Sequence, residues 1–449
     1  MVLEVQHREL DARIAFAIKA SQLGYSTVFC KKAYLYSKSK YLTKGVVILK
    51  SIGKKNIKFI STLKKDGHIV CSFDEEGLLF HDSEKYCKRR LPLECFNQIK
   101  YFFAWGKNDA EAIKSFFPTQ KQKIKITGNA RIELLKKPLN QIYIKGAEEI
   151  KKRYGEFILV NTKFGYANYI MQNKNFSIVD GLSKAWNLTD KEKIFYKYIL
   201  ESQLKRRQDL KDLLDLFEIK HPKIKFIIRP HQSETPDFWN NVKNRNVIII
   251  RDGNPSISWM IAAKNVVSFN CTTAIEAKFF DIDHLNYVPL SQHDFELPNL
   301  INKNFDNIID LEKFLIQNNK SQDKKLLNIK ELKNNIENID SDYVLNIIES
   351  IKDEYLNFGK VEKDKYSNSF FLLYFRLKRF IINLFTVELK KLKKDNAYRL
   401  LLQKNPNTNI SNIKKRSREI MDILDLNKDK IKISEIYPDV YCYESINDK

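Results

Sequence analysis

Apolar residues occur along the first 300 positions in short runs, which alternate with longer stretches where they recur every three or four residues. Runs of four to six apolar residues are typical of buried strands, and the longer period is typical of amphipathic helices. In the first part of the chain this pattern predicts helices over 9–23, 55–65 and 108–116, and strands over 2–5, 25–30, 45–49, 69–73, 101–105 and 123–126. Strands that alternate with helices favour a parallel sheet covered on both faces. Residues 1–137 are therefore predicted to form one Rossmann-like domain.

The same alternation restarts after a linker over 138–145. Strands are predicted over 157–161, 225–228, 247–250 and 265–269, with helical periodicity over 183–217 and a helix that starts near Thr273. Residues 146–305 are thus predicted to form a second Rossmann-like domain. The predicted fold class is α/β, with two Rossmann-like halves that face a cleft.

Beyond about residue 306 the strand pattern stops, and residues 306–449 are predicted to be a helical, basic extension. Its segment 370–399 is apolar and basic, with eight basic against two acidic residues over 374–399. A basic amphipathic helix can lie on an anionic membrane surface. The alternative is that its apolar side packs on the domains.

Three acids, Asp74, Glu75 and Glu76, end the predicted strand over 69–73 and precede Gly77. Strand ends face the ligand crevice in open α/β sheets, and crowded carboxylates raise one another's pKa, as a general base requires. A solvated acidic turn is the alternative. The turn after the first strand, with His7, Arg8 and Glu9, is a further candidate on this acceptor side, although a turn histidine is often without function.

Polar residues also follow the strands of the second half. His231 comes directly after a buried strand, where an imidazole can donate a hydrogen bond to a phosphate. Thr272 and Thr273 begin a helix, where hydroxyls and backbone N–H groups can bind an anion. The remaining candidates on the donor side are Asn161, Thr162, Gly165, Arg229, Asn270 and Glu276. Arg229 could instead pair with Glu234 or Glu276, and Glu276 suits the first turn of a helix for electrostatic reasons.

The composition limits the class of protein. The chain has 449 residues, 43% of them hydrophobic, and a net charge of +23, which indicates an anionic partner or a bias spread along the chain. Six cysteines without CxxC spacing indicate neither a zinc site nor a disulfide framework, and no metal motif stands at a strand end. No uncharged apolar stretch reaches the roughly 18 residues of a membrane span. We therefore expect a cytoplasmic protein, possible membrane contact being peripheral, at the inner face of the cytoplasmic membrane.

Several segments together resemble bacterial surface carbohydrate biosynthesis proteins, a family with the two-domain GT-B glycosyltransferase architecture. The matching segments are ELDARIAFAIKASQLGY, GVVILKS, DEEGL, FAWG, TGNARIELL, ILVNTKFG, RPHQSE and NCTTAIEA. More distantly, the order of acids, histidine and hydroxyl pair is similar to bacterial sialyltransferases and to transferases of 3-deoxy-manno-octulosonic acid (Kdo).

The resemblance implies a role for each candidate residue. Glu75 or Glu76 would deprotonate the acceptor hydroxyl, and His231 would contact the donor phosphate and assist departure of CMP. Thr272 and Thr273 would hold that phosphate, with Asn270 nearby. The chain departs from the pattern in two places, with His231-Gln232 where His-Pro is usual, and Thr272-Thr273 where a Ser-Ser or Ser-Thr pair is usual.

Three functions follow as hypotheses. The first is a metal-independent, cofactor-free glycosyltransferase of capsule or lipopolysaccharide synthesis, which moves an acidic sugar from a CMP-activated donor to a glycan or lipid-linked glycan acceptor. The second is a polyol-phosphate transferase of the same fold with a CDP-activated donor. The third is a basic nucleic-acid-binding or scaffold protein, which the net charge favours but for which no nucleic-acid motif is present, so no nucleic-acid partner is expected.

Overall fold

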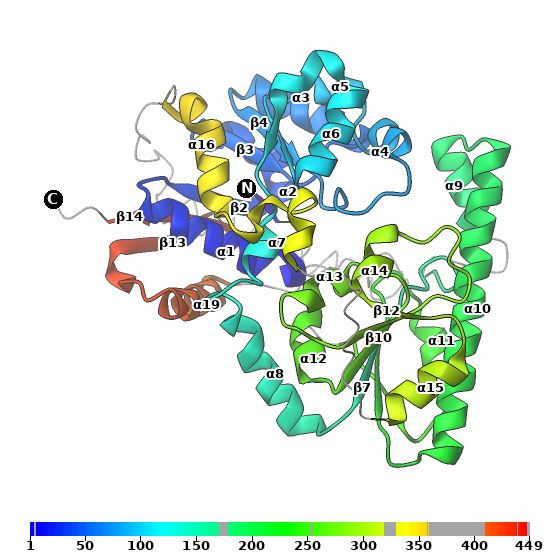
Figure 1. Ribbon diagram of the computed structural model, residues 1–449. Helices are drawn as coiled ribbons and strands as arrows, with labels where there is room; N and C mark the ends of the chain where they lie inside the picture. The colour runs from blue at the N-terminus through cyan, green and yellow to red at the C-terminus, as the bar shows by residue number, and fades with distance from the viewer. Residues whose placement is uncertain are drawn as a thin grey trace, which may run out of the picture. The chain divides into compact units, whose positions relative to one another are not determined.

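The chain folds into two compact units, Met1–Ile142 together with Leu332–Lys449, and Tyr143–Glu331 (Figure 1). We call them unit 1 and unit 2. The structure, a computed structural model, describes residues 1–3, 6–169, 178–251, 254–317, 329–356, 358, 409–437 and 439–446; the side chains of residues 6–8 and 356 are outside this description. Each unit is built on parallel β-sheet, so the predicted α/β class is confirmed. The predicted cleft between two halves stays a prediction.

Unit 2 contains a six-stranded parallel sheet in the order β12-β11-β10-β7-β8-β9. Its strands are β7 (Ile158–Asn161), β8 (Phe226–Arg229), β9 (Val247–Ile249), β10 (Asn265–Ser268), β11 (His284–Tyr287) and β12 (Lys303–Phe305). Its helices are α8 (Gln141–Tyr154), α9 (Ile178–Trp186), α10 (Asp190–Lys220), α11 (Pro236–Asn240), α12 (Ser256–Ala262), α13 (Thr273–Lys278), α14 (Glu296–Ile301) and α15 (Ile308–Ile316). The predicted helical stretch over 183–217 is therefore two helices, because Asn187 has positive φ and Thr189 caps α10 in a capping box with Glu192.

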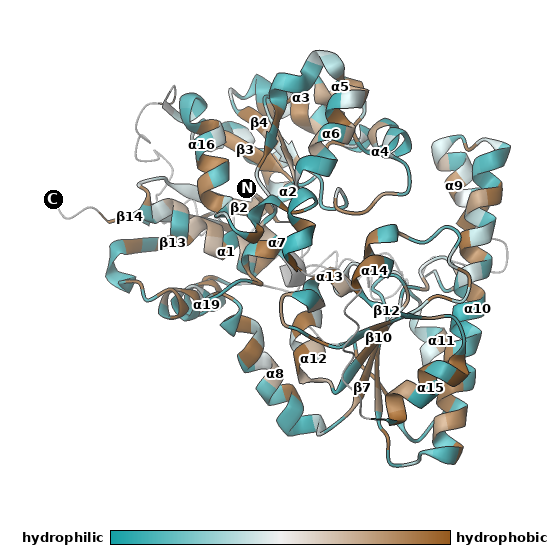
Figure 2. Cartoon of the chain, viewed as in Figure 1, coloured by the Kyte–Doolittle hydropathy of each residue, from teal (hydrophilic) through white to brown (hydrophobic). Residues whose placement is uncertain are grey.

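Helices cover both faces of this sheet. On one face, Ile158 and Val160 of β7 pack in a core with Leu213 of α10 and Leu311 of α15. On the other face, the Arg229 guanidinium lies 5.3 Å from the ring centre of Trp259 in α12. Figure 2 shows the strands of this sheet as largely hydrophobic, as expected for parallel strands buried on both faces.

Unit 1 contains two sheets, where the sequence predicted one. A parallel sheet has the order β3-β4-β5-β6, and a mixed sheet has the order β1-β2-β14-β13. The strands are β1 (Val2–Leu3), β2 (Thr27–Lys31), β3 (Val46–Leu49), β4 (Ile69–Phe73), β5 (Phe102–Ala104), β6 (Ile124–Ile126), β13 (Ile431–Tyr437) and β14 (Val440–Ser445). The first two predicted strands thus form a sheet with residues from the end of the described chain.

The helices of unit 1 surround these sheets. They are α1 (Gln6–Gln22), α2 (Lys32–Lys38), α3 (Ile57–Lys65), α4 (Ser83–Arg90), α5 (Leu93–Phe96), α6 (Lys107–Phe116), α7 (Ala130–Glu133), α16 (Tyr343–Leu356) and α19 (Ile410–Ile423). Short 3₁₀ turns lie at Ser39–Tyr41, Lys54–Asn56, Pro118–Lys123, Ile329–Asn334, Glu337–Ile339 and Lys428–Lys430. Helix α1 lies among them, with Asp11 bound by both Nε and Nη2 of Arg416 in α19, at 2.7 and 2.8 Å.

The C-terminal part of the chain differs from the predicted helical extension. Strand β14 pairs with β2 and with β13, both antiparallel. Residues 329–331 and α15 belong to unit 2, whereas residues 332–446 return to unit 1. The prediction of a separate helical extension over 306–449 was wrong, because residues 431–437 and 440–445 are strands of unit 1. The search for continuous apolar runs overlooked β13, where Ile431, Lys432 and Ile433 alternate in the manner of a half-buried strand.

A segment over 332–346 docks on the two motifs FAWG and TGNARIELL of unit 1. A Cβ on Gly106 would lie 2.5 Å from the carbonyl carbon of Asn335, and one on Gly128 would lie 2.0 Å from Oδ1 of Asn338. Gly128 also has φ of +81°. Both positions therefore need glycine so that the returning chain can approach.

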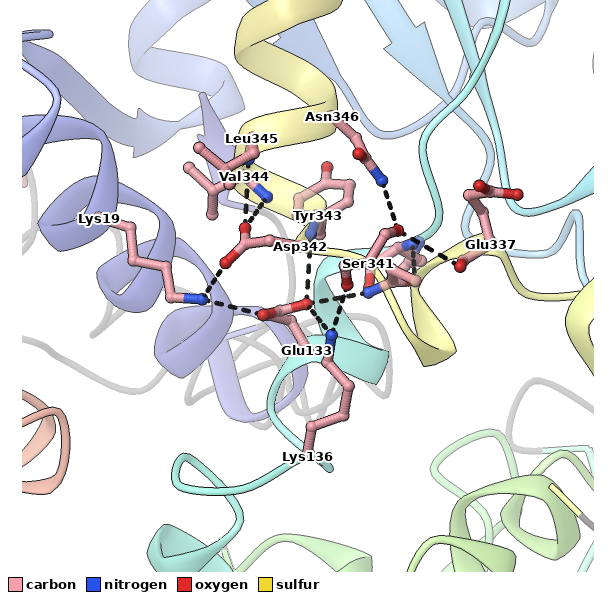
Figure 3. Close-up of polar contacts among 12 residues, drawn as sticks. Lys19, Glu133, Lys136, Glu337, Ser341, Asp342, Tyr343, Val344, Leu345 and Asn346 are labelled. Carbon is pink, nitrogen blue, oxygen red and sulfur yellow. Dashed lines mark hydrogen bonds and ion pairs between the residues drawn. The ribbon is translucent and has the colours of Figure 1, made fainter. Parts of the chain in front are cut away.

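The carboxylate of Glu133 is the centre of this docking (Figure 3). Its Oε1 accepts from Lys19 Nζ at 2.9 Å, and its Oε2 accepts from Lys136 Nζ at 2.8 Å and from the Tyr343 backbone N–H at 3.3 Å. Lys19 also binds Asp342 at 2.6 Å, and Asp342 accepts from the first backbone N–H groups of α16. Both oxygens of the buried Glu133 carboxylate thus have hydrogen-bond partners, as the burial of a charged group requires.

The predicted membrane-surface segment over 370–399 lies outside the described residues. Among the helices that the structure does describe, none combines the length and apolar character needed to cross a bilayer.

We predict that replacing Asn338 by alanine destabilises unit 1 by roughly 2–4 kcal/mol. The fully buried Asn338 side chain accepts from the Asn129 N–H at 2.9 Å and donates to its carbonyl at 3.0 Å, so alanine leaves both buried groups without these bonds. Urea unfolding followed by fluorescence measures the change. Asn334→Ala, at an exposed position of the same segment, is the matched control and should stay within about 0.5 kcal/mol. Equal stability of the two variants would contradict the prediction.

Candidate functional site

Four polar residues line up at the carboxyl ends of neighbouring strands in unit 2. Asn161 of β7 is in register with Arg229 of β8 and with Ser268 of β10, and Ser268 is in register with Asn286 of β11. In parallel open sheets this edge is where ligands bind. The loops that follow these strands carry the remaining predicted donor-side residues.

Glu234 holds the loops after β7 and β8 together. Its side chain has no exposure, and its Oε1 accepts from Thr162 Oγ1 at 2.6 Å, from the Phe164 N–H at 2.9 Å and from the His231 N–H at 3.2 Å. Its Oε2 accepts from Trp239 Nε1 at 2.9 Å. Burial raises the pKa of the Glu234 carboxyl group, and these donors oppose the rise. The predicted site residue Thr162 is thus buried, and its hydroxyl serves the fold.

His231 is exposed, and its ring orientation is set by Ser233. The Ser233 backbone N–H donates to Nδ1 at 3.2 Å, and the Ser233 hydroxyl oxygen lies 2.7 Å from the same nitrogen. A ring nitrogen that accepts a hydrogen bond carries no proton, so neutral His231 has its proton on Nε2. Ser233 thus fixes which edge of the exposed ring faces its own turn.

Gly165, a predicted donor-side residue, packs against Ser233 in the loop after β8 that carries His231. A Cβ on Gly165 would lie 2.5 Å from the Ser233 hydroxyl oxygen. The backbone of the loop after β7 therefore packs directly on the residue that orients His231. Direct contact between Gly165 and a nucleotide stays a prediction.

Asn270 adopts a left-handed conformation, with φ of +57°, at the end of β10. Its buried side-chain amide donates to the Phe295 carbonyl at 2.8 Å and to Asn299 Oδ1 at 2.9 Å, and its own Oδ1 accepts from the Phe295 N–H at 2.8 Å. These bonds explain Asn270 by its role in the fold. Its predicted contact with a donor stays a prediction.

The predicted hydroxyl pair follows in the same loop. Thr272 precedes α13, Thr273 is its first residue, and Glu276 lies in its first turn, as expected from the sequence. All three residues are half-buried. The structure brings them to the same sheet edge as Asn161, Arg229 and His231.

Two basic side chains at this edge come from the ends of β7 and β8. Lys163 Nζ donates to the Asn270 carbonyl at 2.5 Å and lies 4.4 Å from the ring centre of Phe295. Arg229 donates to the Asn254 carbonyl at 2.9 Å, besides its contact with Trp259. The sequence argument overlooked Lys163, although a lysine two residues after a buried strand is a signal that could have identified it.

The three acids of unit 1 have different environments. Asp74 is buried and forms a bidentate ion pair with Arg90, through Nε and, at 2.5 Å, Nη2. Burial raises the pKa of the Asp74 carboxyl group, and Arg90 opposes the rise. Glu75 is half-buried and Glu76 is exposed. Asp74 therefore has a clear structural role, and the two glutamates are the better candidates for chemistry.

The acceptor-side candidates Glu9 and Glu75 meet through Lys50, a residue that the sequence argument did not select. Lys50 Nζ lies 2.9 Å from Oε1 of the buried Glu9, and its carbonyl accepts from the Glu75 N–H at 3.3 Å. The predicted turn with His7 and Arg8 is wrong, because α1 already begins at Gln6. The side chains of His7 and Arg8 lie outside the described residues. In the described part of the chain, no three His, Cys, Asp or Glu side chains are grouped as metal ligands.

Comparisons with known proteins add a distant likeness of fold. No family model matches the chain, and no curated protein matches it in sequence. Among solved structures, it is similar to the wall teichoic acid polymerase TagF with CDPG, with 11% identity, 66% of this chain and 69% of that chain covered, and a TM-score of 0.42. It is also similar to UDP-GlcNAc 2-epimerase from Methanocaldococcus jannaschii (15% identity, 73% and 80% covered, TM-score 0.39) and to UDP-N-acetylglucosamine 2-epimerase from Rickettsia bellii (10%, 73% and 77%, 0.42). At these scores the likenesses assign no residue and no substrate to this chain.

We predict that the buried side chain of Asp109, in α6, makes unit 1 less stable as the pH rises from about 4 to about 8. Burial raises the pKa of Asp109 to about 8, so the folded chain keeps a proton that the unfolded chain releases near pH 4. Asp109→Asn keeps an oxygen for the Trp105 N–H, which Asp109 Oδ2 accepts at 3.1 Å. The variant should gain stability relative to the natural chain as the pH rises through this window.

Urea unfolding at pH 5, 6.5 and 8 measures this difference. Glu111→Gln, at an exposed position on the same helix, is the control and should show no such trend. Parallel stability curves for Asp109→Asn and the natural chain would contradict the prediction.

We predict that Gly165→Ala disturbs the His231 ring without contacting it. The new methyl group would displace the Ser233 hydroxyl, so Nδ1 keeps only the longer hydrogen bond from the Ser233 backbone N–H, and the share of the Nε2–H tautomer should fall. Side-chain ¹⁵N shifts of histidine-labelled protein report the tautomer. Gly45→Ala is the control, since nothing lies within 4 Å of its added Cβ. An unchanged Nε2–H tautomer in Gly165→Ala would show that the Ser233 hydroxyl does not orient the ring.

Proposed function

We propose that the chain is a GT-B glycosyltransferase that transfers an acidic sugar from a CMP-activated donor to a surface-glycan acceptor. The observation that supports this proposal most directly is the position of His231 after β8, with its ring bonded to Ser233. The exposed His231 imidazole follows β8 at the carboxyl edge of a parallel sheet, and Ser233 bonds its Nδ1, so that Nε2 is the ring nitrogen that we propose for contact with a donor phosphate.

The basic side chains around this edge favour an anionic leaving group. Lys163, Arg229 and His231 come from the ends of two adjacent strands, and Thr272 and Thr273 follow a third. Charged and hydroxyl donors in fixed positions stabilise the negative charge that gathers on a departing phosphate. Departing CMP carries its charge on a single phosphate, so a small group of neighbouring donors is enough to bind it.

The proposed reaction is a single displacement. The acceptor hydroxyl oxygen attacks the anomeric carbon, and the bond from that carbon to the phosphate oxygen of CMP breaks. Glu75 or Glu76 takes the acceptor proton, and the electron pair of the broken bond leaves with CMP. Asp74 is excluded as the base in this proposal because its carboxylate is already bound by Arg90.

A nucleotide screen tests the donor class. We expect CMP to raise the melting temperature more than CDP, UDP or GDP, since a ligand at 100 times its Kd adds about 2.7 kcal/mol to the stability of the protein. A stronger shift with CDP would favour the polyol-phosphate transferase, and no shift with any nucleotide would reject both. Salt-sensitive binding to DNA or RNA in place of nucleotides would favour the nucleic-acid-binding alternative.

We predict that His231→Ala and one of Glu75→Gln and Glu76→Gln each lower sugar transfer about 100-fold or more, as expected when a group that handles a proton or a developing charge is removed. Transfer is measured as CMP release with an acceptor glycan. Glu84→Gln, at an exposed position of unit 1, is the control and should retain activity. Full activity in all three variants would reject the assignment.

A further inference from the structure

Three buried polar atoms near the carboxyl edge of unit 2 have no hydrogen-bond partner among the described residues. They are Nδ2 of Asn161, Oγ of Ser268 and Oγ1 of Thr273. The Ser268 side chain has no exposure, Asn161 is 5% exposed, and Thr273 is half-buried. Buried polar groups are nearly always paired in folded proteins, so three such atoms in one region require an explanation.

These residues belong to one side of the sheet. Asn161 and Ser268 are register partners on β7 and β10, so their side chains point to the same face, about 5 Å apart. Arg229, the register partner of Asn161 on β8, identifies this face as the one that α12 covers, through its contact with Trp259. Helix α13 begins at Thr273, directly after the turn that leaves β10.

Asn286, the next polar residue of this row, differs from Ser268 because its side chain is hydrogen-bonded. The Asn286 side chain accepts from the Asn270 N–H at 2.6 Å and donates to Asn299 and Asn304 at 2.7 and 2.8 Å. Its neighbour Ser268 has no such partner in the described chain. Within this row of register partners, the unsatisfied groups are those of Asn161 on β7 and Ser268 on β10, which the fold does not use.

We propose that Asn161, Ser268 and Thr273 form a polar floor that donates hydrogen bonds to an oxyanion of the sugar donor, its phosphate or the carboxylate of the sugar. This inference rests on the proposed function for the identity of the ligand. An amide NH₂ and two hydroxyl groups all donate, and an oxyanion is an acceptor at every oxygen. Burial increases from Thr273 to Asn161 to Ser268.

Lys163 supplies a positive charge beside this floor. Its ammonium group bonds to the carbonyl of Asn270, two residues after Ser268 and three before Thr273, and it follows Asn161 by two residues. A cation next to neutral donors strengthens their bonds to an anion in a water-poor site. Ser268 is the residue that no sequence motif indicated and that the structure adds to the donor side.

Substitutions with apolar residues of similar shape separate binding from folding. Ser268→Ala, Asn161→Leu and Thr273→Val remove donors that have no partner in the described chain, so the melting temperature should stay the same or rise. Ser202→Ala is the matched control, because the buried Ser202 hydroxyl donates to the Leu290 carbonyl at 3.1 Å. The control should lower the melting temperature and leave ligand affinity unchanged.

Calorimetric titrations with cytidine, CMP, UMP, inorganic phosphate and CMP-N-acetylneuraminic acid test the ligand. If the floor binds phosphate, we expect Ser268→Ala to weaken the binding of CMP at least 10-fold and to leave the binding of cytidine unchanged. If the floor binds carboxylate, only the binding of the CMP-sugar should weaken. Unchanged affinity for every probe, or a loss of stability that matches Ser202→Ala, would overturn the floor. The natural protein could instead bind phosphate or UMP, with a loss of affinity in Ser268→Ala, and fail to bind the cytidine ligands. That result would support the floor and reject the proposed donor.

Discussion

A carboxylate without access to water sets the geometry of the carboxyl edge in unit 2. Burying Glu234 is unfavourable unless its oxygens are bonded. The loops after β7 and β8 supply three donors, and Trp239 of α11 supplies the fourth. If these loops moved apart, the Glu234 carboxylate would stay buried and lose its hydrogen bonds. His231 takes its position from the same interaction, because its backbone N–H is one of the four donors.

Unit 1 uses a buried carboxylate in a comparable way. Glu133 binds two lysines and the start of α16, and so fixes the returning segment over 332–346 to α1 and α7. The motifs FAWG and TGNARIELL, which contribute to the family resemblance, are explained here by the close approach of that segment at Gly106 and Gly128. A motif shared with a family can therefore report a packing requirement, and it needs no contact with substrate.

The strands that are buried on both faces could be predicted well from the sequence. The predicted strand over 69–73 coincides with β4, and the predictions for β7 and β10 differ by one residue, because continuous apolar runs leave little freedom. Strands β11 and β12 were missed, since HLNY and KNF carry the polar ends that join the asparagine network. Strand β14 was missed because its partner β2 lies about 400 positions earlier, and β13 was missed because it pairs only with β14.

The position of the candidate residues at strand ends could be predicted from the sequence, but their contacts could not. His231, Glu75 and the threonine pair follow strands, and strand ends can be read from local pattern. Glu234 bonds to Thr162 in another loop, Ser233 packs on Gly165 of that loop, and Ser268 is notable for lacking a partner in the described chain. No local period reveals these relations. Gly165 shows the difference clearly: glycine was expected there, and the neighbour that requires it was not.

The antiparallel pairing of β14 with β2 has a consequence for the order in which the molecule is assembled. Unit 2 is continuous in the chain and has all its strands once residue 305 has been synthesised. The mixed sheet of unit 1 must wait for residues 440–445, so the edge of β2 is without its native neighbour while more than 400 further residues leave the ribosome. During translation, unit 2 is therefore the part of the protein that can mature first, and the beginning of the chain is among the last parts to be completed.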